Sequence, residues 1–102
     1  ARNDGVTLLF IACQNGHLKI VLLLLETSAA INQAGEEGAT PLFMACQEGH
    51  LECVRLLLEV GAAVNQAQQN GATPLYIACY KGQEGHLECV RLLLEASAAV
   101  NQ

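Results

Sequence analysis

The sequence is poor in aromatic and basic residues. It contains no tryptophan, two tyrosines and two phenylalanines among 102 residues, and five lysines and arginines against ten aspartates and glutamates. A net charge of −5 argues against binding to nucleic acid or to an anionic membrane, because both depend on clustered positive charge. The longest apolar run, 20–25, has six residues. A membrane-spanning helix needs roughly 18, so we expect no such helix.

The cysteines lack the spacing of a metal site or of a disulfide framework. Cys13, Cys46 and Cys79 are spaced alike along the chain, and Cys53 and Cys89 form a second set. The count is odd and no pair is separated by two to four residues, which argues against both zinc and disulfides. We expect small buried side chains kept reduced inside a cell. The expected localisation is therefore intracellular (cytoplasmic or nuclear), or the chain is a recombinant piece of a longer protein, since it shows no leader and no initiating methionine.

One stretch, 38–66, organises the chain because it occurs three times. It recurs with few substitutions over 71–102 and with more substitutions over 5–33, with a period of 33 residues. Such a period indicates a repeat array, in which each unit buries its apolar faces against its neighbours. We predict a single domain of three units, about 1–34, 35–67 and 68–102. Unit three carries three additional residues, which we place at Lys81-Gly82-Gln83, where they would lengthen the turn before His86.

Each unit is predicted to contain a tight turn and then two helices. Asn-Gly at 70–71 indicates a hairpin tip, since glycine readily takes the positive φ that such a tip requires. Thr-Pro at 40–41 indicates a helix start, because the hydroxyl caps the helix and proline suits its first position. The two helices of unit two are expected over about 41–47 and 51–60. Gly61 would end the second one.

The repeated stretch resembles the ankyrin repeat. In unit two, the segments that carry the resemblance are Thr40-Pro41-Leu42, Ala45-Cys46, Gly49-His50-Leu51-Glu52, Leu56-Leu57-Leu58-Glu59 and Gly61-Ala62-Ala63-Val64-Asn65. The resemblance covers nearly the whole chain. It implies an all-α solenoid, an ankyrin-like stack of three helix-turn-helix units with short β-hairpin finger loops. It also implies a non-enzymatic protein–protein interaction module that presents a concave helix face and hairpin tips to a protein partner.

The histidines do not indicate catalysis. His17, His50 and His86 each follow a glycine before the second helix, so they recur because the unit recurs. None has a serine, cysteine or aspartate at a spacing that suggests a triad. By resemblance to the family, a histidine here bonds the connecting turn. We therefore expect no enzymatic activity, no metal and no cofactor.

The resemblance assigns partner contacts to the hairpin tips and to the inner face of the first helices, where the residues vary between units. At the tips these are Asn3, Asp4, Val6, Glu36, Glu37, Ala39, Gln69, Asn70 and Ala72. On the inner face they are Gln14, Asn15, Gln47, Glu48, Tyr80 and Lys81. Tyr80 is the clearest candidate, because tyrosine is enriched among residues that dominate binding energy. The acidic tips suggest a partner with a basic surface and salt-sensitive association.

Phe10, Phe43 and Tyr76 share one position in the three units, where the family usually has histidine. We expect these aromatic rings to wedge between stacked helices rather than to contact a ligand.

Other interpretations remain open. Units two and three are nearly identical, which also fits an engineered or consensus-like ankyrin scaffold with no native partner. Unit three repeats the apolar pattern of unit two through Leu87, Cys89, Val90 and Leu93, without the polar outer face that a terminal unit needs. The chain is therefore expected either to self-associate through its uncapped ends, as a structural end-to-end assembly, or to be part of a longer array. The insertion is either neutral or a binding loop beside Tyr80.

Overall fold

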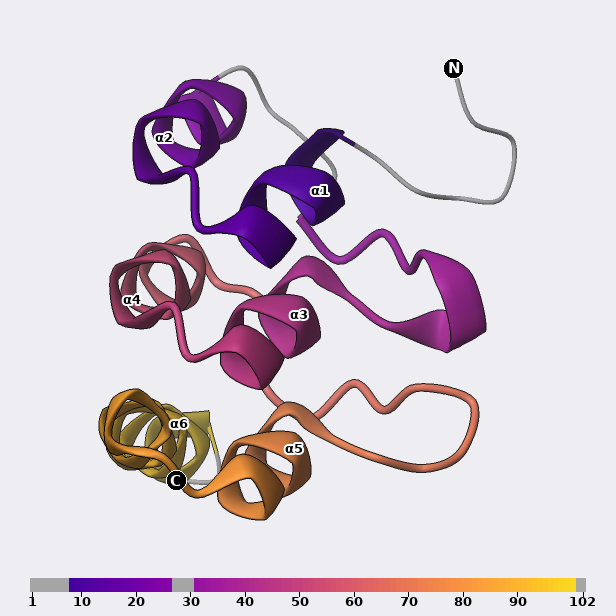
Figure 1. Cartoon of the computed structure of the whole chain (residues 1–102), viewed down its shortest axis with the longest axis vertical. Coiled ribbons are helices and arrows are strands. Elements are labelled where there is room, and N and C mark those ends of the chain that lie inside the picture. Colours follow the sequence, from indigo (N-terminus) through magenta and orange to yellow (C-terminus); the bar gives the residue numbers. More distant parts are fainter. Residues whose placement is uncertain (1–7, 27–30, 101–102) are drawn as a thin grey trace.

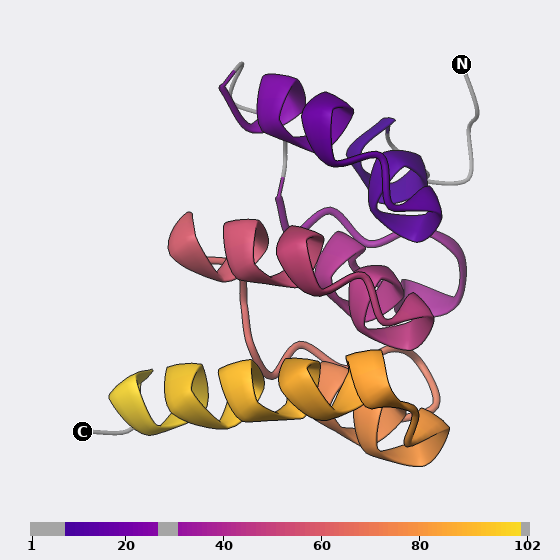
Figure 2. The same ribbon diagram turned by 60° about the vertical axis from the view of Figure 1, so that its left-hand side comes forward.

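Three helix pairs stacked in a row make up the computed structural model, which describes residues 8–26 and 31–100 (Figure 1). The pairs are α1 (Leu8–Asn15) with α2 (Leu18–Glu26), α3 (Pro41–Glu48) with α4 (Leu51–Glu59), and α5 (Pro74–Lys81) with α6 (Glu84–Val100). A single 3-10 turn, η1 (Glu36–Gly38), precedes α3. The first helices form one column and the second helices another (Figures 1 and 2). The predicted all-α repeat stack is confirmed.

The Thr-Pro dipeptides start the first helices of units two and three as predicted. The Oγ1 atoms of Thr40 and Thr73 each accept a hydrogen bond from the backbone N–H three residues later, at 3.1 Å. Proline follows at the first helical position, where no N–H is required. Each helix ends at a glycine with positive φ, 72° at Gly49 and 63° at Gly82. Local sequence therefore sets both limits of these helices.

The core runs through the stack, between the two columns and between successive pairs. Its fully buried side chains include Leu9, Val21, Leu42, Val54, Leu57 and Leu93. Four cysteines are buried as predicted, whereas Cys79 is exposed, and all five thiols are unpaired. Burial, together with a smaller contribution from repulsion by the Cys53 thiol of the next unit, raises the pKa of the Cys13 thiol to about 12. Burial also raises the pKa of Cys46, with a smaller contribution from Cys89.

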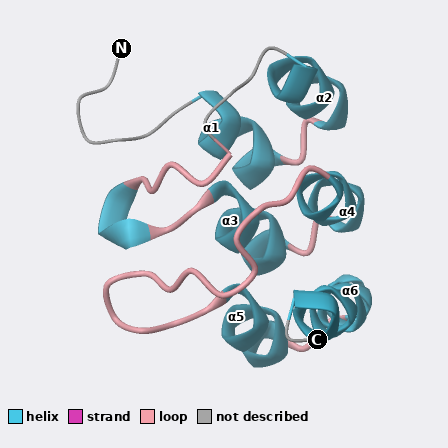
Figure 3. Cartoon of the chain, turned by 180° about the vertical axis from the view of Figure 1, so that it is seen from behind, coloured by secondary structure: helices cyan, strands magenta, loops and turns pink. Residues whose placement is uncertain are grey.

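The loops before α3 and α5 extend to one side of the stack and form the predicted fingers (Figure 3). In each finger a backbone N–H bonds the carbonyl four residues later, at 2.7 Å from Gly35 and 2.9 Å from Gln68. The N–H of Gln69 donates to the carbonyl of Glu37 at 2.7 Å and so ties the two fingers together. The described fingers contain no strand, so these are hairpin-shaped turns rather than β-ladders. The expected finger of unit one lies outside the described residues.

The additional residues of unit three do not lengthen the turn, contrary to the prediction. α5 ends at Lys81 and Gly82, as α3 ends at Glu48 and Gly49, so the first helices are equally long. α4 begins just after His50, whereas α6 begins at Glu84, two residues before His86. The three additional residues are therefore Gln83-Glu84-Gly85, of which Glu84 and Gly85 extend α6 at its N-terminus.

The second helix of unit three also continues where that of unit two stops. α4 ends before Gly61, which has a φ of 88°. In unit three the same place is Ser97, and α6 continues through it to Val100, past the ends of α2 and α4 (Figure 2). Serine has no special ease at positive φ, and the neighbouring alanines favour helix. None of the described helices is long and apolar enough to cross a bilayer.

Candidate partner-binding groove

A hollow of about 300 Å³ opens where the described fingers meet α1 and α3. We call it the groove, and it is lined by Phe10, Gln14, Glu37, Ala39, Met44, Gln47 and Gln68. A second hollow of about 270 Å³ lies on unit three and is lined by Asn70, Gly71, Ala72 and Tyr76. Both hollows include finger residues, so the fingers provide the walls and the first helices provide the base.

A small apolar cluster forms the floor of the groove. It consists of the buried residues Phe10, Ala39, Phe43, Met44 and Ala72. Phe43 and Phe10 are only 1% and 5% exposed, so the prediction that these rings pack between helices is confirmed for both. A Cβ atom at Gly35 would lie 2.9 Å from the ring of Phe10, which shows how closely that finger packs on the aromatic ring. This buried apolar floor therefore supports the polar lining residues of the groove, which we call the rim: Gln14, Glu37, Gln47 and Gln68.

The structure brings several predicted contact residues together around this floor. Gln14 and Gln47 come from the ends of α1 and α3, and Glu37 comes from the tip of the finger between them. Glu37 is exposed and has a φ of 59°, a left-handed conformation that is unusual for glutamate. Its backbone carbonyl is held by the Gln69 N–H of the next finger. Side chains from three separate segments thus surround one hollow.

Other predicted residues lie beside the groove or beneath it. Ala39 and Ala72 are 4% and 9% exposed and belong to the floor, so they shape the groove from below. The Oδ1 atom of Asn70 accepts the Ala72 N–H at 2.9 Å and the Gln68 amide at 3.1 Å, so this side chain holds its own finger. Gln69 is exposed at the same finger.

The exposed ends of the first helices carry the remaining predicted residues. Asn15 donates to the carbonyl of Ile11 at 3.1 Å, and Glu48 accepts from the Gln47 amide at 3.2 Å. Both side chains remain exposed beside the groove. They are therefore accessible, although neither lines either hollow.

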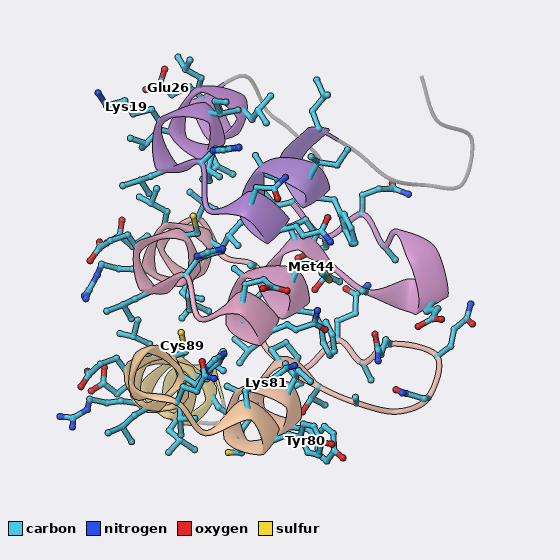
Figure 4. The ribbon with its side chains drawn as sticks, in the orientation of Figure 1. Lys19, Glu26, Met44, Tyr80, Lys81 and Cys89 are labelled. Atoms are coloured by element: carbon cyan, nitrogen blue, oxygen red, sulfur yellow. The ribbon has the colours of Figure 1, made fainter. Side chains whose placement is uncertain are left out.

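Tyr80 and Lys81 lie at the exposed end of α5 (Figure 4). The ring of Tyr80 stacks on that of Tyr76, with centroids 6.1 Å apart and planes inclined by 17°. The two residues are 72% and 55% exposed, so Tyr76 differs from the buried Phe10 and Phe43. The predicted wedge is therefore wrong for Tyr76, because no further unit of the described chain covers it.

Met44 and Gln68 were not predicted as contact residues, and Phe10 was expected to pack between helices rather than to contact a partner. Met44 lies beside the fingers in Figure 4 and is 7% exposed. Unit three has isoleucine in its place, and this variation within a constant framework was the available indication. Asn3, Asp4 and Val6 lie outside the described residues, as does the side chain of Glu36.

The histidines join neighbouring units. The Nε2 atom of His50 lies 3.2 Å from the carbonyl oxygen of Gln14, and that of His86 lies 2.9 Å from the carbonyl oxygen of Gln47. The expected bond to a connecting turn therefore runs to the end of the first helix in the preceding unit. Across the described part of the chain, no three histidine, cysteine or acidic side chains are grouped as metal ligands.

The fold and the groove agree with one family. A family model described as ankyrin repeats (3 copies) matches residues 9–102. A search of curated proteins found no individual relative that matches the chain. Ankyrin repeats generally mediate protein–protein interaction and are typically non-enzymatic. Since the match covers nearly the full length and the helix pairs stack with the same period, this chain belongs to the ankyrin repeat family.

Proposed function

We propose that this chain is a rigid, non-enzymatic binding module that takes a segment of a protein partner into the groove. One observation carries the proposal. Repeat positions that vary between otherwise similar units line one hollow above a buried floor: Glu37 is replaced by aspartate in unit one and by asparagine in unit three, and Gln47 is replaced by tyrosine in unit three. Variation confined to an accessible surface, on a framework that hardly changes, is typical of a binding site grafted on a fold.

The groove is arranged before a partner arrives. The hydrogen bond between Gln69 and Glu37 joins the fingers, and the side chain of Asn70 bonds within its finger. Histidine bonds of 3.2 and 2.9 Å hold the successive first helices at a fixed spacing. Because these groups are ordered on folding, little conformational entropy is lost on their side when a partner binds.

The chemistry of the rim favours a basic and partly apolar partner. Glu37 and Glu48 are exposed at or beside the groove, and the chain has a net charge of −5. The stacked Tyr76 and Tyr80 offer aromatic surface at the unit-three end of the same side. We expect the aromatic pair to provide binding energy and the carboxylates to provide salt-sensitive attraction.

Affinity capture from cell extract, followed by titration of each purified candidate, tests this function. The variants Tyr80→Ala and Glu37→Lys are expected to weaken a genuine partner by at least about tenfold, a loss of roughly 1.4 kcal/mol. Arg55→Glu is the matched control, because Arg55 is exposed on α4 in the column of second helices. Partners that respond to Arg55→Glu but not to the groove variants would contradict the proposal.

The groove lies on one side of the stack and leaves both ends of the stack uncovered. Binding at Glu37 and Gln47 is therefore compatible with contact between the ends of two copies, whereas a partner segment that covers Tyr76 would compete with that contact.

A further inference from the structure

The described stack exposes apolar side chains at both of its ends. We define the first-pair face by Leu8, His17, Ile20 and Leu23, and the last-pair face by Tyr76, Cys79, Leu87, Val90 and Leu94. Ile20 is 48% exposed, whereas its counterparts Cys53 and Cys89 are 2% and 0% exposed. Leu87 is 59% exposed on the last-pair face. Each face thus exposes residues at repeat positions that a neighbouring unit covers inside the stack.

The contacts inside the chain show what each face is shaped to meet. Cys53 of unit two lies close enough to Cys13 of unit one to raise its pKa, and Cys89 stands in the same relation to Cys46. Ile20 occupies the position of Cys53 and Cys89, while Cys79 occupies the position of Cys13 and Cys46. A further repeat of the same contact would set Ile20 against Cys79.

The histidine bond gives a second, polar indication of the same register. His50 and His86 bond the carbonyl of the seventh residue in the preceding first helix, Gln14 or Gln47. The counterpart of that residue in α5 is Tyr80. The imidazole of His17, in contrast, is exposed and makes no hydrogen bond within the described residues.

Glycines next to these carbonyls make room for the rings. A Cβ atom at Gly16 would lie 2.8 Å from the ring of His50, and one at Gly49 would lie 3.2 Å from the ring of His86. Gly82 has the same left-handed conformation, but an added Cβ would meet only the carbonyl oxygen of Cys79, at 3.6 Å. The last-pair face therefore has, beside Gly82, the same kind of space that holds a histidine ring in each inner contact.

We propose that copies of this chain bind each other head to tail, the first-pair face of one copy on the last-pair face of the next. The imidazole of His17 then donates to the carbonyl of Tyr80 beside Gly82, and Ile20 enters the hollow of about 250 Å³ around Cys79 and Leu87. A second copy is the occupant because this chain's own unit-to-unit contact is the one that both faces continue.

The additional turn of α6 does not oppose this arrangement. A Cβ atom at Gly85 would lie 3.0 Å from the carbonyl oxygen of Gly49, so this turn packs back on unit two rather than over the last-pair face. The contact is heterologous, since the two faces differ. Such contacts continue into chains of copies unless a closed ring forms.

Salt distinguishes this contact from groove binding. Copies that each carry a charge of −5 repel one another, so added salt screens the repulsion and strengthens stacking. Attraction of a basic partner to the groove weakens under the same conditions. A result that contradicts stacking therefore does not contradict partner binding in the groove, and the reverse also holds.

Sedimentation velocity over a range of chain concentrations tests the stacking directly. The wild-type chain is expected to exceed dimer mass as concentration rises. Ile20→Glu and Leu87→Glu should each weaken association at least about tenfold, because each places a charge in an apolar contact. An equimolar mixture of these two variants should recover dimers only, through the one intact face of each.

Leu22→Glu is the matched control, since Leu22 stands in α2 at the place of the exposed Arg55 and Arg91 and is not on either face. It is expected to associate like wild type. A wild-type chain that remains monomeric to about 1 mM overturns the proposal. Dimers formed by Ile20→Glu alone or by Leu87→Glu alone would also overturn it, because they would show a symmetric contact.

A crosslink tests the register without disturbing the apolar faces. Ile20→Cys, treated with a short bismaleimide, is expected to form a ladder of covalent oligomers through Cys79, and the added change Cys79→Ala should abolish the ladder. Leu22→Cys should form no ladder. Equal crosslinking of Ile20→Cys and Leu22→Cys would refute the register.

Discussion

The inner and outer units of this stack contain the same sequence pattern and differ in what covers it. Phe43 is 1% exposed and Tyr76, at the same repeat position, is 55% exposed. Cys46 is fully buried, whereas its counterpart Cys79 is exposed. Burial in this molecule is therefore a property of the neighbouring unit rather than of the residue, as expected where each repeat contacts only its neighbours.

Unit three relies more on local helix formation than unit two does. α6 has 17 residues against nine in α4, and its additional first turn packs on Gly49. A longer helix adds hydrogen bonds without needing a further unit. The comparison thus predicts that substitutions in the inner unit lower the free energy of unfolding strongly, whereas substitutions at the outer faces lower it little.

The largest expected difference is between the two aromatic residues at one repeat position. Phe43→Ala empties a fully buried site and is expected to cost about 3–5 kcal/mol of unfolding free energy. Tyr76→Ala removes a side chain that is 55% exposed and should cost under about 1 kcal/mol. Urea denaturation of both variants measures the difference. Similar losses would mean that the outer face is covered in solution, and dilution would then reveal whether copies cover it.

Alkaline pH is expected to destabilise the stack through its inner thiols. An exposed thiol ionises near pH 9.0, whereas burial raises the pKa of Cys13 to about 12 and that of Cys46 as well. The folded state retains protons that the unfolded state loses, so this contribution is complete below pH 9 and falls between about pH 9 and 12. The fall reaches at most about 1.4 kcal/mol per pH unit for each such thiol.

Denaturation midpoints at pH 7 and pH 10 measure this effect. Cys46→Ala lowers stability at neutral pH but should show a smaller loss between the two pH values than wild type does. A loss that is unchanged in Cys46→Ala and in Cys13→Ala would assign the alkaline effect to other groups.

The smallest expected difference concerns the histidines. His86→Ala removes a 2.9 Å bond and leaves the carbonyl of Gln47 without that donor, which should cost about 1–2 kcal/mol. His17→Ala, measured in dilute solution, should change stability by less than about 0.5 kcal/mol, because that side chain is exposed. Thermal unfolding of the two variants compares an inner contact with an outer one. Equal losses would show that the link between units adds nothing to stability.

Much of the fold was predictable because its determinants are local. The period of 33 residues, the caps at Thr40 and Thr73 and the stop at Gly61 are each encoded within a few residues, and the structure confirms them. The groove was predicted only in part. Gln14, Glu37 and Gln47 were expected at the site, whereas the buried positions of Ala39 and Ala72 depend on packing between fingers and helices.

The number of units, the start and end of most of their helices and the resemblance to one family follow from the amino-acid sequence alone, since turn glycines, caps and apolar spacing act over a few residues. Two other features emerge from the folded stack: the additional residues extend α6 rather than the turn, and Tyr76 is exposed while Phe43 is buried. The physical reason is that these outcomes depend on contacts with a neighbouring unit, and identical residues meet different neighbours along the stack.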